Sequence, residues 1–155
     1  MRLTLALFLL FTFGLSFGQV KGISSEIQLS YSGYNHNIMA DFSRDKWCLS
    51  LGINTNYSKH ANLNLSAIGG VAEFGYAVLD STLQLMPVIR AQFIPGKSST
   101  IFETYIGHRV GYSWKPRWRF YNVLGIGGYQ ESSKEYNYTL NGFSYCATFG
   151  LQYRF

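Results

Sequence analysis

The stretch Phe143–Phe155, FSYCATFGLQYRF, alternates apolar residues with small or polar ones along its whole length. Successive side chains of an extended strand point to opposite faces, so this segment has one apolar face and one polar face. The apolar face holds Phe143, Tyr145, Ala147, Phe149, Leu151, Tyr153 and Phe155, and the other holds Ser144, Cys146, Thr148, Gly150, Gln152 and Arg154. Because chain ends normally fray into water, a chain that ends on such a strand is expected to place it in a membrane.

The end of this strand also has a defined spacing. Thr148 is polar, Gly150 follows two positions later, and Tyr153 and Phe155 supply a hydrophobic and an aromatic residue. This spacing resembles the assembly signal in the terminal strand of bacterial outer-membrane β-barrel proteins. The resemblance implies that the barrel-assembly machinery of a Gram-negative bacterium inserts the chain into the outer membrane. It implies no particular activity.

The amino-terminal segment has the features of an export signal. Arg2 precedes an apolar run over 3–11, and Ser16-Phe17-Gly18 supplies small residues at the point of cleavage. A membrane-spanning helix would need about 20 apolar residues, more than this run offers. The sequence therefore predicts a signal peptide over 1–18, cleaved near Gly18/Gln19, and a barrel domain over 19–155.

The composition indicates a surface that is partly not in water. Only 14% of the residues are charged, whereas 17% are aromatic and 16 are glycines. Typical soluble domains are about 25% charged. The formal net charge is +5, but the cations are scattered and no basic cluster lies among aromatic residues, which argues against nucleic-acid binding. A basic surface also suits anionic lipid headgroups.

Alternating segments separated by turn residues recur along the rest of the chain, without a helical period. Strands are predicted at 23–33, 37–43, 46–57, 62–79, 82–94, 101–114, 118–130 and 142–155. An even number of strands leaves both chain ends on the periplasmic side of a bacterial barrel. The periplasmic turns are then 43–45, 80–81 and 115–117, and the outward connections are 34–36, 58–61, 95–100 and 131–141. The predicted fold is all-β, an eight-stranded antiparallel transmembrane β-barrel.

The alternation also predicts which residues share the apolar face. They are Ile23, Ile27, Leu29 and Tyr31 in the first strand, Trp47, Leu49, Leu51, Ile53 and Tyr57 in the third, and Leu83, Leu85, Ile89, Ala91 and Phe93 in the fifth. The fourth segment is too long for one straight strand and changes phase, which predicts a bulge around Gly69-Gly70. In the seventh, either Phe120, Leu124 and Ile126 or Tyr121, Val123 and Tyr129 lie on the apolar face.

Alternation alone does not say whether the apolar face points out or in, so a secreted lipocalin-like barrel with a ligand cavity is the alternative. An apolar exterior is favoured because the opposite face is dominated by small polar residues and has too few charges for a soluble surface. Trp47, Trp114 and Trp118 also fall at the periplasmic strand ends, where an interfacial aromatic girdle is expected.

Charged residues of both signs fall on the polar face. They are Glu26, Asp41, Glu73 and Glu103, and Arg90, Arg109 and Arg119. The interior of an eight-stranded barrel is just wide enough to be filled by side chains, so an ion-pair network is expected there instead of a channel. Strands five and six place Arg90 on a diagonal with Glu103, and we predict an ion pair between these two residues.

No constellation of catalytic or metal-binding residues stands out in the sequence. His36 and His60 lie at loop edges and His108 falls on the apolar face, and none belongs to a His-x-Ser pair of the lipid A deacylase type. Cys48 and Cys146 lie on strands that are not neighbours, so we predict two thiols packed inside the barrel and no disulfide. The sequence predicts no catalytic residue, no metal site and no cofactor.

Over the whole mature chain, the sequence resembles the OmpA membrane domain and the OmpX class of small barrels. The resemblance implies a structural or surface-interaction role, in contact with outer-membrane lipid and lipopolysaccharide, with an extracellular protein or glycan as a candidate partner. Missing a peptidoglycan-binding domain and having modest loops, the chain is not expected to anchor the cell wall or to adhere strongly. The candidate contact loop holds Glu131, Lys134, Glu135, Tyr136 and Tyr138. A lipid-modifying enzyme, of the lipid A deacylase or acyltransferase type, and a narrow pore are the alternative functions.

Overall fold

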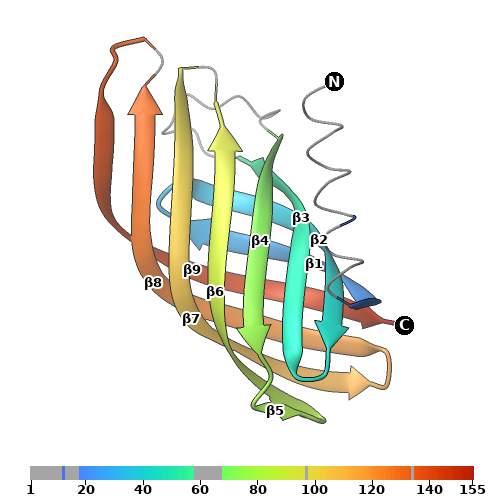
Figure 1. Cartoon of the computed structure of the whole chain (residues 1–155). Coiled ribbons are helices and arrows are strands. Elements are labelled where there is room, and N and C mark those ends of the chain that lie inside the picture. The colour runs from blue at the N-terminus through green and yellow to red at the C-terminus, as the bar shows by residue number, and fades with distance from the viewer. Residues whose placement is uncertain (1–11, 13–17, 58–67, 97, 134) are drawn as a thin grey trace.

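The strands predicted from the alternation form one antiparallel sheet that closes on itself (Figure 1). The computed structural model describes residues 12, 18–57, 68–96, 98–133 and 135–155. Its strands are β1 (Gln19–Ser30), β2 (Gly33–Arg44), β3 (Trp47–Asn56), β4 (Ile68–Tyr76), β5 (Leu79–Asp80), β6 (Leu83–Pro95), β7 (Ser99–Lys115), β8 (Trp118–Ser133) and β9 (Thr139–Arg154). Pairing of β1 with β9 and of β4 with β6 closes the ring, and the two-residue β5 only extends the edge of β6. The eight-stranded antiparallel barrel expected from the sequence is confirmed.

The two ends of the barrel differ in their connections. The short-turn end has the tight turns between β2 and β3 and between β7 and β8, together with β5. Asp45 lies in the first of these turns with a φ of 54°, a left-handed conformation that Asp adopts more readily than most residues. The loop end has the turn at Tyr31 and Ser32 and the connections that follow β3, β6 and β8.

Several predicted boundaries are wrong. The first turn lies at Tyr31 and Ser32, and residues 34–36, predicted as a loop, belong to β2 because β1 and β2 pair up to Ser30 and Gly33. The connection after β8 is also shorter than predicted, since β8 extends to Ser133 and β9 begins at Thr139.

The bulge predicted around Gly69-Gly70 is also wrong. Pairing of β4 with β3 is continuous from Ile68 to Tyr76, so the phase change that suggested a bulge does not interrupt the described strand. Residues 62–67, which gave the first half of that phase, lie outside the described residues. The irregularities of register lie elsewhere, between Val20 and Gly22 on β1 and between Ser113 and Lys115 on β7.

The barrel has apolar side chains outside and polar ones inside. Ile27, Ile89 and Phe149 are among the exposed apolar residues, whereas Arg90 and Glu26 are almost completely buried. The structure resolves the two alternatives for the seventh predicted strand, here β8, because Phe120, Leu124 and Ile126 are exposed and Tyr121 and Val123 are buried. The interior also contains a small apolar cluster: Met86, Val88, Tyr121 and Val123, with Cys48 packed against it.

Several aromatic side chains lie at the short-turn end of the barrel. Trp47 and Trp118 are the first residues of β3 and β8, and Trp114 lies near the end of β7. Trp47 stacks on Phe74 with ring centroids 5.1 Å apart, and Trp118 meets Tyr153 edge-on at 4.9 Å. The three tryptophans therefore lie at one end of the barrel, as the sequence predicts. Among the described residues, no helix has the length and apolar character needed to cross a membrane.

Candidate functional site: the charged interior of the barrel

The charged network in the barrel interior starts from one cross-strand pair. Glu73 on β4 lies directly opposite Arg90 on β6, and the alternation turns both side chains inward. Arg90 Nη2 is 2.5 Å from Glu73 Oε2, and Arg90 Nη1 is 2.6 Å from Glu26 Oε1 on β1. Arg90 also donates to Gln28 Oε1 at 2.9 Å and to Thr148 Oγ1 at 3.3 Å. One guanidinium group therefore ties β6 to strands on the far side of the barrel.

A second arginine completes the charge balance. Arg109 Nη2 on β7 lies 2.6 Å from Glu73 Oε1, and its guanidinium carbon is 4.2 Å from the centre of the Tyr121 ring. The Tyr121 hydroxyl donates to Glu26 Oε2 at 2.9 Å. Two carboxylates thus face two guanidinium groups, which is the arrangement that makes burial of charge tolerable. Removing one member would leave an uncompensated buried charge, at a cost of about 3–5 kcal/mol.

The interior is sealed at the level of this network. Arg90 has 0% of its surface exposed, and Glu26, Glu73 and Arg109 have 2% each. A continuous aqueous channel would leave the side chains along its wall in contact with water, so none passes these residues. The prediction of a side-chain-filled interior at this level agrees with the exposed fractions.

The ion pair predicted between Arg90 and Glu103 is wrong. In the register of β6 and β7, Arg90 lies opposite Tyr105, and Glu103 lies opposite Gln92, closer to the loop end. Arg90 points to the carboxylates of Glu26 and Glu73 instead. The Glu103 carboxylate accepts hydrogen bonds from the Ser30 and Ser32 hydroxyls, from the Ser32 backbone N–H at 3.1 Å and from the Gln92 amide.

Asp41 is likewise held by neutral donors. Ser50 Oγ donates to Asp41 Oδ1 at 2.6 Å, Ser24 Oγ donates to the same oxygen at 3.2 Å, and Gln152 Nε2 donates to Oδ2 at 2.9 Å. Arg119 forms its ion pair with Asp80 of β5, at 2.7 Å. The seven charged residues predicted to face the interior are therefore all buried there, but they divide into separate groups instead of one network.

A ladder of amides between these groups was not singled out from the sequence. Asn37 Nδ2 donates to Glu26 Oε1 at 2.7 Å, and Asn54 Nδ2 donates to Asn37 Oδ1 at 2.6 Å. Asn56 Nδ2 donates in the same way to Asn35 Oδ1 at 2.7 Å. These asparagines share the inward phase of their strands, which the alternation predicts, but the alternation does not show which amides meet across the strands.

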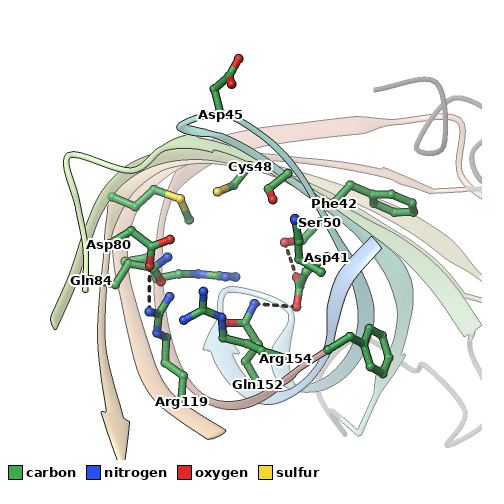
Figure 2. A pocket seen from close by; sticks show the side chains of 15 residues that line it. Asp41, Phe42, Asp45, Cys48, Ser50, Asp80, Gln84, Arg119, Gln152 and Arg154 are labelled. Atoms are coloured by element: carbon green, nitrogen blue, oxygen red, sulfur yellow. Dashed lines mark hydrogen bonds and ion pairs between the residues drawn. The ribbon is translucent and has the colours of Figure 1, made fainter. Parts of the chain in front are cut away.

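The interior is hollow at the short-turn end (Figure 2). A cavity of about 350 Å³ is lined by residues of β1, β2, β3, β5, β6, β7, β8 and β9, and its wall includes Asp41, Gln84, Arg119 and Arg154. Figure 2 shows Arg119 reaching Asp80 on one side and Gln152 reaching Asp41 on the other. The acids and bases on this wall nearly balance, so the cavity has no dominant charge that would select a ligand.

Two residues of the predicted assembly signal have a packing role in the barrel wall. Gly150 lies opposite Tyr121 in the pairing of β8 with β9, and a Cβ at that position would collide with the Tyr121 ring. Thr148 bonds Arg90. The glycine therefore lets the Tyr121 ring lie across the neighbouring strand and reach Glu26.

Possible catalytic groups lie on the outer face. Ser25 Oγ and His36 Nε2 are 2.9 Å apart, on neighbouring strands β1 and β2. A search for His-x-Ser within one strand misses such a pair, because only the register brings it together. A serine hydrolase also needs a group that orients the imidazole, and Ser25 is the one hydrogen-bond partner of the His36 ring in the described residues.

Neither a metal centre nor a disulfide is formed by the described residues. No group of three or more His, Cys, Asp and Glu side chains there is close enough to hold a metal ion. Cys48 and Cys146 are free thiols, on β3 and β9. Cys146 is buried and Cys48 packs against the interior apolar cluster, as predicted.

The candidate surface loop is smaller than its predicted range. Glu131 pairs with Leu140 inside the β8–β9 ladder, and its carboxylate accepts a hydrogen bond from the Tyr31 hydroxyl at 3.2 Å. Burial, the hydrogen bond with Tyr129 and the nearby Glu131 carboxylate raise the pKa of the Tyr31 phenol. Glu135, Tyr136 and Tyr138 are exposed, with the two rings stacked at 6.5 Å, and Lys134 lies outside the described residues.

The comparisons with known proteins add no relative. No family model, no curated protein and no solved structure matches the chain.

Proposed function

We propose that this chain is an integral outer-membrane β-barrel with a closed interior and a structural or surface-interaction role. The observation that carries the proposal is that apolar side chains lie on the outside of the barrel and charged ones lie inside, the inverse of a water-soluble protein. Ile106 and Phe143 have 68% and 70% of their surfaces exposed, whereas Arg90 and Glu103 have 0%. In water-soluble proteins, large apolar side chains such as Ile and Phe are mostly inside and charged ones are mostly exposed. Lipid around the barrel removes the contradiction.

A closed barrel is one of the two structures that satisfy every backbone hydrogen bond in hydrocarbon. The outward faces of the strands supply the apolar band, and the tryptophans at the short-turn end supply an interfacial girdle. Tyrosines at the loop end, including Tyr31, Tyr34 and Tyr57, are exposed and supply amphipathic rings for the opposite interface.

The sealed interior favours a structural or interaction role over a pore. Ions would have to pass the level of Arg90, Glu26 and Glu73, where the side chains have no or almost no contact with water. The parts of the barrel that can meet a partner are then the loop end and the outer face. At the loop end, Tyr136 has 76% of its surface exposed and stacks with Tyr138, which offers flat aromatic surface to an extracellular protein or glycan.

Refolding tests the membrane assignment. The mature chain is diluted from urea into phospholipid vesicles, into detergent micelles and into plain buffer, and its gel migration is compared before and after boiling. We expect a β-rich, heat-modifiable species in vesicles and micelles only, and no conductance steps in planar bilayers. A folded monomer in plain buffer would overturn the membrane proposal, and steady conductance would overturn the closed interior.

Replacing the loop separates the two roles. Residues 134–138 are exchanged for a two-residue Asn-Gly turn, which suits a β-hairpin, and the matched control exchanges residues 96–98 between β6 and β7. Both variants are introduced into cells that lack the wild-type protein, and the sensitivity of the envelope to detergent is measured. A structural role predicts that both variants restore resistance. A contact role for Tyr136 and Tyr138 predicts that only the control does.

A further inference from the structure

His108 is a polar residue in the apolar outer face that the proposed function does not explain. It lies on β7 opposite Pro87 of β6 and Leu124 of β8, and it is exposed. Trp114 is six positions further along the same strand, so at a rise of about 3.3 Å per residue and a tilt of about 40° the imidazole lies roughly 15 Å from the tryptophan girdle. That is near the middle of an apolar band about 25 Å tall.

Asn122 is a second such residue on the same face. It lies on β8 opposite Val110 of β7 and Phe149 of β9, and its side chain points outward between the buried Tyr121 and Val123. Within the described part of the chain, neither the His108 imidazole nor the Asn122 amide has a hydrogen-bond partner. Hydrocarbon cannot supply one, so these groups are costly if lipid alone surrounds them.

An outward-facing polar residue on the opposite wall has a hydrogen-bond partner within the barrel. His36 on β2 also points outward, but its ring bonds Ser25 Oγ at 2.9 Å within the same copy. The pairing order places β2 and β7 on opposite sides of the ring. His36 therefore has a hydrogen-bond partner within its own copy, whereas among the described residues His108 and Asn122 have none.

The same wall is hollowed. An apolar concavity of about 840 Å³ lies over β6 to β9, with His108 and Ala147 on its surface. Side chains that stand out from the sheet border it: Ile106, Leu124, Ile126, Phe143 and Tyr145 are between 53% and 70% exposed. One face therefore has both a hollow and the projecting apolar side chains that could fill one.

We propose that this wall is the interface of a homodimer, in which a second copy of this chain covers the concavity in the membrane. The inference rests on the proposed function, because it requires the outer face to lie in lipid. In a two-fold interface, each surface meets itself, so residue i of one copy contacts residue j of the other and the reverse. His108 of each copy then bonds Asn122 of the other.

A second copy suits this wall better than lipid does, for two reasons. Imidazole and amide side chains each hold a donor and an acceptor, so a two-fold contact satisfies both groups of both copies, whereas an acyl chain satisfies neither. The projecting residues around Ile106 and Phe143 also find a hollow of matching character on the opposing copy. The interface is thus self-complementary in shape and in hydrogen bonding.

Energy transfer between labelled copies tests the interface. The mature protein is labelled with donor or acceptor dyes at its amino terminus, refolded together in phosphatidylcholine vesicles and diluted with added lipid. We expect transfer that falls reversibly on dilution. His108→Leu removes the polar group and Ala147→Trp fills the concavity, and each should raise the dissociation constant by about tenfold or more, which is the effect of losing ~1.4 kcal/mol. His36→Leu, the same change on the opposite wall, is the control and should leave association unchanged.

The outcomes separate this inference from the proposed function. Wild-type protein that is heat-modifiable in vesicles but shows no energy transfer at any lipid ratio overturns the dimer and leaves the barrel assignment intact. Protein that does not enter vesicles overturns both. Association that survives both His108→Leu and Ala147→Trp, each shown by heat-modifiability to be folded, overturns this wall as the interface.

Discussion

Substitution of Arg90 by Met tests the charged interior most directly. The network around Arg90 contains the carboxylates of Glu26 and Glu73 and the guanidinium groups of Arg90 and Arg109, so its charges sum to zero. Met has a similar length but no charge, and Arg90→Met therefore leaves one buried negative charge uncompensated. We expect a loss of about 3–5 kcal/mol in the free energy of unfolding, the usual cost of breaking a buried ion pair.

The assay is urea unfolding of the refolded barrel in lipid vesicles, followed by tryptophan fluorescence. Trp47, Trp114 and Trp118 lie on the rim and far from Arg90 in the chain, so their emission reports on unfolding of the whole barrel. The matched control is Arg44→Met, which removes an exposed arginine at the end of β2 and should change the free energy by less than about 0.5 kcal/mol.

A double variant decides whether charge balance is the reason for the loss. Adding Glu26→Gln to Arg90→Met restores neutrality, since Glu73 and Arg109 remain paired, and the amide keeps the shape of the side chain. We expect the double variant to be more stable than Arg90→Met alone by about 2 kcal/mol, within the range of coupling between residues in contact. The reasoning is refuted if Arg90→Met lies within about 1 kcal/mol of wild type, or if Glu26→Gln destabilises it further.

Three further results are expected. Gly150→Val forces a side chain against the Tyr121 ring and should lower the free energy of unfolding by about 1–3 kcal/mol, as overpacking usually does. Urea unfolding should show that Tyr121→Ala in the same chain recovers part of that loss, and equal stability of Gly150→Val and wild type would contradict the contact. Cys48 should react with a maleimide in the folded barrel because it lies on the wall of the cavity at the short-turn end, whereas Cys146 is 2% exposed and should react only after boiling. Mass spectrometry of the labelled peptides checks this order, and equal labelling of the two thiols would contradict it. Arg90→Ala shortens the side chain that seals the interior and should produce conductance steps in planar bilayers. Arg90→Met refills the space and should produce none. Absence of conductance from a folded Arg90→Ala barrel would place the seal elsewhere.

The positions of the interior groups were predictable, and their partners were not. Alternation places Arg90, Glu103 and Glu26 on one face of their strands without any knowledge of the fold. Glu103 is close to Arg90 in the sequence, across a single turn, but proximity in the chain does not decide which groups pair. Glu26, the actual partner, is 64 residues away, and it comes within reach only because the barrel closes.

Local pattern was also a poor guide to turn positions and to pairs between strands. The turn at Tyr31 and Ser32 was misplaced because residues 34–36 are polar and look like a loop, although they pair with β1. The Ser25 and His36 pair was missed because it depends on the register of two strands. A one-residue slip would turn either side chain to the other face.

The sequence by itself determined the all-β class, the eight strands and, for most of them, the residues that share a face, because side-chain direction in a strand has a period of two and depends only on the neighbouring residues. Tertiary structure alone decided that Arg90 joins Glu26 and Glu73, that Glu103 is held by neutral donors, and that His108 and Asn122 share one hollowed wall. These relations depend on the register of each strand pair and on closure of the ring between β1 and β9, which bring together side chains that no local pattern relates.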